Sequence, residues 1–433
     1  MPLCDHYGNP LSTSSAGARD HYDTGLARFL AADIGAADAF AAAVTDDPGW
    51  ALAHAALARA RAMSGDMPGA RQAIAEAQAQ APAGTPREQA HVDTMALLLS
   101  GKAAETRAAV AAHLRDHPRD AMVAQLCTNI FGLIGFSGEV GREAELLAFT
   151  SALLPHYGEN WWMMSMHALS LCETGQLDAS TALMDRALAL NPRNAHGAHF
   201  RAHAQYEAGE TTAGRAYLGG WMADYDPHAL LHSHLSWHLA LWALHDGDAG
   251  AMWQAVDSGV APGAALGLPI NVVTDTAAIL YRAEIAGIAV APERWRALAD
   301  YVAQTFPNPG QSFVDIHAAL AHAMAGDGAR LAAIAETEKG FAADLVRPVA
   351  RAWGHMARGQ WQDALDDLTG VMASAVRLGG SRAQRDLINW PGPYALAPRP
   401  EGRGPPRPCH PPTGPRKGPA RGAHALTPAP PTV

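Results

Sequence analysis

The segment "AADAFAAAVTDDP" at residues 36–48 is matched 34 residues later by "ARQAIAEAQAQAP" at residues 70–82. In this alignment Ala36, Phe40, Ala43 and Pro48 correspond to Ala70, Ile74, Ala77 and Pro82. Small residues at these spacings allow two helices to cross closely, and proline ends the second helix because it cannot continue the hydrogen-bond ladder. The segment therefore predicts a repeating pair of helices.

The same pattern continues along the chain. Glycine precedes proline by 17 residues at Gly65, Gly101, Gly138 and Gly175. A unit that starts at residue 161 places Ala168, Gly175, Ser180, Met184, Ala187 and Pro192 at the equivalent positions, and the unit from residue 195 adds Ala202 and Gly209. Units that start near residues 87 and 124 are more degenerate. A period of about 34 residues is typical of tetratricopeptide repeats. We therefore predict an all-α helix-pair solenoid, a right-handed superhelix whose first helices line a concave groove.

The pattern loosens after about residue 229, where "ALHDGD", "AEIAGI", "AMAGDG" and "MARGQW" each close an apolar helix at a glycine. Helix pairs continue to about residue 376. No segment alternates with a period of two, so no sheet is predicted. The predicted parts are an N-terminal extension (1–15), tetratricopeptide-like repeats (16–228), degenerate helical repeats (229–387) and a Pro-rich tail (388–433).

Charge is distributed unevenly. Residues 391–433 contain six Lys/Arg residues and one acidic residue, whereas the remainder contains 26 and 41, a net charge of about −15. A body of this charge repels phosphate groups and attracts a basic protein segment. We therefore expect a protein or peptide partner, and neither nucleic acid nor an anionic membrane.

The cysteines indicate a reducing environment. Cys4, Cys127, Cys172 and Cys409 are far apart, and no C-x-x-C motif occurs, which excludes a typical disulfide framework or thiolate zinc site. The start "MPLCDHYGNP" does not resemble an export signal, and the apolar windows are too short and interrupted to span a membrane. A cytoplasmic location is the simplest expectation.

The last part of the chain has a different composition. Residues 391–433 hold 14 of the 30 prolines and show no helical or strand periodicity, which predicts an extended, disordered tail. Such a tail could be a ligand for SH3-type domains. The favoured alternative is a shifted reading frame in a GC-rich gene. The solenoid would then lack its polar terminal cap, and an apolar helix face around residues 361–387 would be exposed and would favour oligomerisation.

Several stretches resemble the tetratricopeptide repeat protein 38 family. They are "YGNPLSTSS" (7–15), "DPGWALAHAALA" (47–58), "HLSWHLALWALHDGD" (234–248), "LYRAEIAG" (280–287), "DIHAALAHAMAGD" (315–327) and "GGSRAQRDL" (379–387). The first and last are the most specific, because neither follows from generic repeat packing. The resemblance covers about 380 residues and ends after Leu387. It implies a fold and no particular activity.

Candidate binding residues are concentrated on predicted first helices. The segment "NAHGAHFRAHAQYEAGE" (194–210) places three histidines at spacings of three, four and seven residues, so they share one stripe of a helix. Because first helices line the groove, this stripe should face inward. Further histidine and tryptophan residues hold similar places in the neighbouring units. The predicted groove contacts are His196, His199, His203, His234, Trp237 and Trp162.

No cofactor and no catalytic residue is predicted, since phosphate-binding, zinc-protease and serine-hydrolase motifs are all missing. His199 and His203 have the i, i+4 spacing of a chelating pair, and His234 is the candidate third ligand for zinc or copper. No carboxylate or cysteine joins them at a characteristic spacing, so a bound metal is not expected.

The favoured hypothesis is a non-enzymatic interaction scaffold that binds a peptide or partner segment in the concave groove. The alternative is a small-molecule or metal-binding protein, or an enzyme, that uses the same His/Trp patch. Histidines in the groove predict an affinity that changes between pH 5 and 7.

Overall fold

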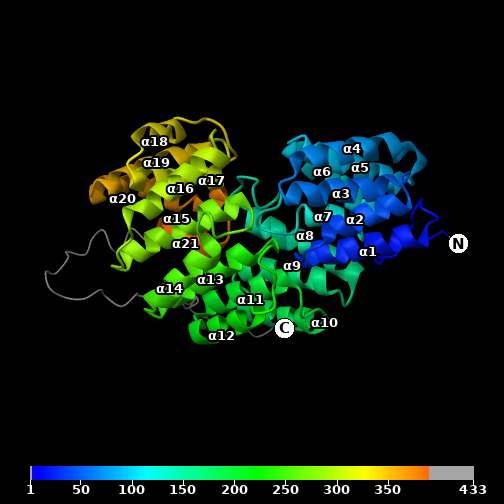
Figure 1. The fold of residues 1–433 in the computed structure, drawn as a ribbon, viewed down its shortest axis with the longest axis horizontal. Helices are drawn as coiled ribbons and strands as arrows, with labels where there is room; N and C mark the ends of the chain where they lie inside the picture. Colours follow the sequence, from blue (N-terminus) through cyan, green and yellow to red (C-terminus); the bar gives the residue numbers. More distant parts are fainter. Residues whose placement is uncertain (1, 390–433) are drawn as a thin grey trace, which may run out of the picture.

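The chain is an assembly of α-helices joined by short connections (Figure 1). The structure is a computed structural model that describes residues 2–389. Its helices are α1 (Ala16–Ala31), α2 (Ala36–Asp46), α3 (Ala51–Met63), α4 (Met67–Gln80), α5 (Pro86–Leu99), α6 (Ala103–Asp116), α7 (Ala121–Gln125), α8 (Arg142–Tyr157), α9 (Trp161–Glu173), α10 (Leu177–Leu190), α11 (Ala195–Ala208), α12 (Thr211–Met222), α13 (His232–His245), α14 (Ala249–Ala255), α15 (Pro269–Ile285), α16 (Pro292–Thr305), α17 (Ser312–Ala325), α18 (Gly328–Ala335), α19 (Ala343–Ala357), α20 (Trp361–Met372) and α21 (Arg382–Asn389). An isolated bridge joins Cys4 to Pro10, and no strand occurs in this range. The predicted all-α fold is confirmed.

The helices pack in consecutive pairs, as the repeat phase predicts. Helix α1 packs on α2, α3 on α4, and α9 on α10. At the first crossing, Gly25 lies against Phe40 so closely that a Cβ atom at this glycine would be 2.7 Å from the aromatic ring. Ala43 and its equivalent Ala77 are fully buried. Small residues therefore set the distance between paired helices, as the sequence indicates.

Glycines end several first helices in the left-handed region of backbone space. Gly65, Gly101 and Gly175 have φ angles of +85°, +72° and +81°, which other residues adopt only with strain. The pair Gly138 and Pro155 was expected to follow the same rule, and that expectation is wrong. Pro155 lies inside α8, and Gly138 lies in an irregular stretch rather than at the end of a helix.

This irregular stretch, residues 126–141, replaces most of a first helix, because α7 ends after five residues. Its aromatic side chains pack on a distant part of the chain. The rings of Phe131 and Phe136 each lie 5.7 Å from the ring of Phe313, and Phe136 stacks on Phe341 at 5.4 Å. The superhelix therefore curls until its early and late repeats touch.

Arg142, the first residue of α8, stabilises this contact between early and late repeats. We call the contacts of residues 126–143 with residues 313, 341 and 376–385 the closure. The buried guanidinium of Arg142 donates hydrogen bonds to the carbonyl oxygens of Gly135 (3.1 Å), Val376 (2.7 Å) and Gly380 (2.6 Å). Arg385 forms an ion pair with Glu143 across the same contact. The segment "GGSRAQRDL" thus has a structural role, since it supplies the late half of the closure.

The segment "YGNPLSTSS" at 7–15 is fixed in a similar way. Tyr7 and Leu11 are buried in the core, and the side-chain amide of Asn9 donates to the Arg119 carbonyl oxygen at 3.1 Å. Arg87 donates to the Pro10 carbonyl oxygen at 3.4 Å. The opening segment is therefore packed onto the repeats and is not a loose extension.

The expectation of an exposed apolar face around 361–387 is largely wrong. On α20, Ala364, Leu368 and Val371 are buried, and α21 packs against α11, α15 and α20. Trp361 and Met372 remain exposed, at 42% and 43%. Oligomerisation through this end of the chain remains a prediction. The described residues there expose little apolar surface that could support it.

Two further expectations concern membrane insertion and the C-terminal tail. Among the described residues, no helix combines the length and the apolar character that crossing a membrane requires. The predicted disordered tail lies outside the described residues, apart from its first two positions.

We expect Arg142→Met to destabilise the protein by about 3–5 kcal/mol, because it leaves carbonyl groups of the closure without donors. Chemical denaturation with helical circular dichroism measures this loss. Arg296→Met is the control, since Arg296 forms an exposed ion pair with Glu293 and should cost less than about 1 kcal/mol. Equal losses for the two variants would contradict this role for Arg142.

Candidate functional site

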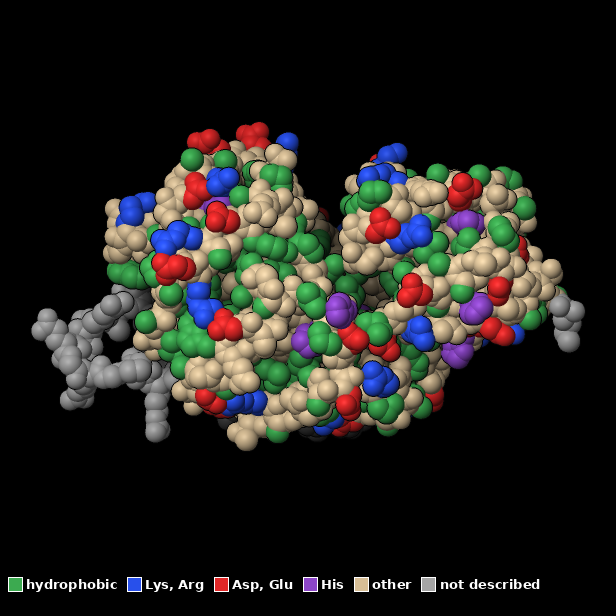
Figure 2. All heavy atoms as spheres, viewed as in Figure 1, with side chains coloured by type: hydrophobic (Ala, Val, Ile, Leu, Met, Phe, Trp, Pro, Cys, Tyr) green, Lys and Arg blue, Asp and Glu red, His purple; other side chains and the backbone are tan. Residues whose placement is uncertain are grey.

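A cavity of about 500 Å³ lies on the inner side of the curled superhelix. The lining residues are Phe29, Arg59, Met63, Leu98, Ala103, Gln125, Leu126, Asn129, Ile130, Phe131, Gly132, Leu133, Phe136, His196, His199, Phe200, Leu230, Leu231, Leu268, Ile270, Asn271, Gly310, Gln311, Phe313, Val314 and Phe341. They come from α1, α3, α5, α6, α7, α11, α15 and α17, from the irregular stretch 126–141, and from the connections before α13, α15, α17 and α19. Figure 2 shows the surface hollowed between the part that carries α6 and the part that carries α17. The concave groove expected from the repeats is thus closed into a partly covered cavity.

Most of the lining is apolar, with one charged side chain, Arg59 on α3. Its Nη2 atom donates to Gln125 Oε1 at 3.1 Å, and its Nε atom has no hydrogen-bond partner. Burial lowers the pKa of Arg59 to about 10, and no carboxylate offsets this shift. The guanidinium is therefore a cation without a counter-charge on the cavity wall. A cavity of this kind favours an acidic group, whereas the net charge of the body suggested a basic partner segment.

The three histidines of the 194–210 segment all lie on α11, as the helix phase predicts. His196 and His199 line the cavity. His196 is half-buried, whereas His199 and His203 are 3% and 1% exposed. The stripe faces the inner side of the superhelix. His203 is buried and does not line the cavity, and His199 is almost completely buried although it lines it.

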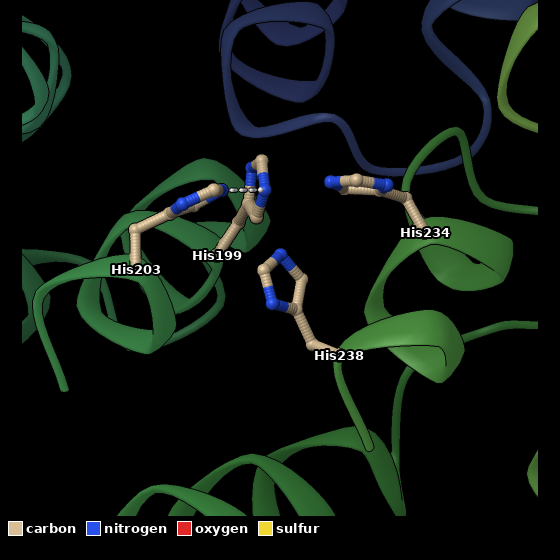
Figure 3. A group of neighbouring side chains, drawn as sticks. All are labelled: His199, His203, His234 and His238. Carbon is tan, nitrogen blue, oxygen red and sulfur yellow. Dashed lines mark hydrogen bonds between the residues drawn. The ribbon is translucent and has the colours of Figure 1, made fainter. Parts of the chain in front are cut away.

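Four buried imidazole rings meet beside this cavity. His199 and His203 are one turn apart on α11, and His234 and His238 are one turn apart on α13. One nitrogen from each ring lies within 4.8 Å of the nitrogens of the other three. Figure 3 shows the rings converging from the two helices. We call these four residues the histidine cluster.

Hydrogen bonds satisfy only part of the cluster. The Nε2 atoms of His199 and His203 are 2.8 Å apart and share one hydrogen bond. His234 Nδ1 lies 2.7 Å from the buried carboxylate of Asp275, so this ring donates from Nδ1. Three further buried atoms, His199 Nδ1, His234 Nε2 and His238 Nε2, find no hydrogen-bond partner among the residues that the structure describes. Such nitrogens can bind a water molecule, an ion or a ligand group.

Burial determines the protonation of these rings. It lowers the pKa of His196 to about 4 and of His203 to about 3, and it holds the pKa of His199 and His238 well below the usual range. The imidazoles of His196, His199, His203 and His238 are therefore neutral at pH 5–7. The sequence predicts a change of affinity between pH 5 and 7. Any change that depends on these histidines should instead occur at lower pH, because their pKa values are lowered.

The two tryptophans of the predicted patch lie in different places. Trp237 stacks on His234, with ring centroids 5.2 Å apart and an interplanar angle of 19°. Trp162 packs instead against Tyr157 at 5.6 Å, in the core formed by the early repeats. Both are buried. Neither lines the cavity: Trp237 packs against the histidine cluster, whereas Trp162 belongs to the core of the early repeats.

Two residues of the site were missed by sequence reasoning. Arg59 occurs in "ALARARAM" together with Arg61. The sequence around the two arginines does not distinguish them, and only their positions around the helix differ. Asp275 is 41 positions from His234, with no motif linking the two. A polar residue inside the apolar run "INVVTDTAAILY" was the available indication of the second.

No protein-family model matches the sequence, so the resemblance to the tetratricopeptide repeat protein 38 family remains a resemblance. Among solved structures, the chain is similar to the crystal structure of the P58(IPK) TPR domain. The identity is 12%, the match covers 88% of this chain and 98% of that chain, and the TM-score is 0.21. A score of this size carries no argument about function. The class of protein rests on the helix pairs themselves: a tetratricopeptide-like solenoid with an internal cavity.

We expect NMR spectra of the metal-free protein to show the His203 ring, which is 1% exposed, still neutral at pH 4, because burial lowers its pKa to about 3. In denaturant the same resonances should titrate near pH 6.5. Since the folded pKa is the lower one, the free energy of unfolding should fall as pH decreases from about 6.5 towards 4. A folded-state midpoint above pH 6 for His203 would contradict the burial described here.

Proposed function

We propose that the protein is a non-enzymatic binding scaffold whose internal cavity receives a short apolar segment of a partner protein that carries one acidic group. The observation that supports this proposal is the mostly apolar cavity with the guanidinium of Arg59 on its wall, for which the described residues supply no carboxylate partner. Helical-repeat proteins commonly bind extended segments on their concave side.

The size of the cavity supports a short segment. A volume of about 500 Å³ lies within the usual range of ligand pockets, roughly 300–1,000 Å³. An entire partner helix, about 10 Å wide with its side chains, needs an open groove, and the contacts between residues 126–142 and 376–385 close the groove here. A few apolar side chains are the best fit.

The acidic group follows from the charge on the wall. Arg59 retains a donor without a partner, at Nε. An arginine offers a planar set of donors that matches a carboxylate in two parallel hydrogen bonds. Asn129, Gln125 and Gln311 add polar groups at the rim or wall. The ligand chemistry is therefore an apolar body with a carboxylate, supplied by Asp, Glu or a chain terminus.

We expect peptides selected by phage display on the full chain to combine apolar residues with an acid, and Arg59→Met to weaken their binding about 10- to 100-fold through the loss of charged hydrogen bonds. Fluorescence anisotropy with labelled peptides measures the affinity. Arg61→Met is the matched control on the same helix, since Arg61 lies outside the cavity lining and should leave the affinity unchanged.

Other outcomes reject the proposal in distinct ways. Equal affinities for the two variants would exclude Arg59 as the anchor. Selection of basic peptides would exclude the cavity as the binding place. Mass spectrometry that finds a stoichiometric small carboxylic acid in the purified protein, combined with no peptide binding, would favour the small-molecule alternative.

A further inference from the structure

The histidine cluster has the composition and the arrangement of a metal centre. It contributes four imidazoles as two i, i+4 pairs, His199 with His203 and His234 with His238, from two helices. Two histidines one turn apart on a helix form a common chelating unit for transition metals. Two such pairs that face each other provide four ligands without any change in the path of the backbone.

The distances allow a tetrahedral ion after small side-chain rotations. Zn–N bonds of about 2.0–2.1 Å place tetrahedral ligand atoms roughly 3.3 Å apart. In the structure the ligand atoms lie within 4.8 Å of one another, and the closest pair described, His199 Nε2 and His203 Nε2, is at 2.8 Å. The 2.8 Å distance is shorter than the ideal N–N separation of roughly 3.3 Å, and the upper limit of 4.8 Å is longer.

Several nitrogen atoms of the cluster carry a lone pair or a proton that takes part in no hydrogen bond with the described residues. His234 is the clearest case, because its Nδ1 atom is bonded to Asp275 and its buried Nε2 atom has no partner. A carboxylate that accepts from the far nitrogen of a histidine is the usual second-shell arrangement at zinc sites, where it fixes the ring and makes the ligand nitrogen more basic.

We propose that His199, His203, His234 and His238 form a binding site for one divalent transition-metal ion, Zn²⁺ being the reference ion, with Asp275 as a positioning residue. Neutral imidazoles without a thiolate are suited to zinc, copper, nickel and cobalt, and they are poorly suited to calcium or magnesium. The proposal does not depend on peptide binding, although His199 also lines the cavity.

Nearby charge limits the affinity. Arg282 lies with its guanidinium 5.8 Å from the ring centroid of Trp237 and donates to the Ala383 carbonyl oxygen. Its positive charge opposes a bound cation, whereas the carboxylate of Asp275 attracts one. We therefore expect weaker binding than at a site that contains thiolates, and a carboxylate placed in the cavity near His199 would help to balance the charge.

The test uses the full chain, prepared without a polyhistidine tag and treated with a chelator that is then removed. Zn²⁺ is added, the protein is separated by gel filtration, and bound metal is measured by elemental analysis. We expect one equivalent to remain bound and Tm to rise by about 4 °C at a hundredfold excess over Kd. Co²⁺ in the same protein should give the intense visible absorption of tetrahedral coordination.

Variants separate this site from other histidines. His203→Gln combined with His238→Gln should lose the bound equivalent and the Co²⁺ absorption, whereas His317→Gln, which changes a buried histidine outside the cluster, should retain both. Asp275→Asn should keep one equivalent and weaken affinity about 10- to 100-fold.

The proposal is wrong if wild-type protein retains no zinc and gives no tetrahedral Co²⁺ spectrum. It is also wrong if the double variant retains the wild-type amount. Failure of the double variant to fold leaves the wild-type spectrum as the deciding result. Peptide binding through Arg59 can succeed or fail independently of each of these outcomes.

Discussion

The shape of this protein depends on one buried cation, the guanidinium of Arg142. Its three hydrogen bonds end on carbonyl oxygens from the irregular stretch before α8 and from the loops around α21. A buried arginine is stable only where such acceptors replace water. The surrounding phenylalanine side chains exclude water, and together these contacts turn an open spiral into a closed one. Residues of this closure, among them Phe131 and Phe136, form part of the cavity wall.

Closure also relates the two proposals. The aromatic residues that join early and late repeats, Phe131, Phe136 and Phe341, are themselves lining residues of the cavity. The same wall carries His199, which belongs to the histidine cluster. Ligand in the cavity and metal in the cluster would therefore contact a shared side chain. Each would stabilise the closed form, because a ligand that binds only one conformation favours it.

The sequence predicts the local parts of this structure well. The 34-residue phase predicts which residues touch within a helix pair, because such contacts depend on helix geometry alone, as Gly25 and Phe40 illustrate. Helix periodicity likewise predicts that His199 and His203 share a stripe. The closure was not predictable in this way. It depends on the summed rotation of many repeats and on an irregular stretch that interrupts them at residues 126–141, and contacts separated by more than 200 positions leave no periodic pattern. The burial of the histidines, the lowered pKa values of His199, His203 and His238, and the partner Asp275 likewise depend on contacts between different helices, so they could not be inferred either.

The two halves of the closure are far apart in time as well as in sequence. Arg142 leaves the ribosome long before its acceptors at Val376 and Gly380, which follow more than 230 residues later. At roughly 5–20 residues per second this interval is about 10–50 s. Until the late residues have been synthesised the closure cannot form, so Phe131 and Phe136 lack the partners Phe313 and Phe341 that cover them in the finished protein.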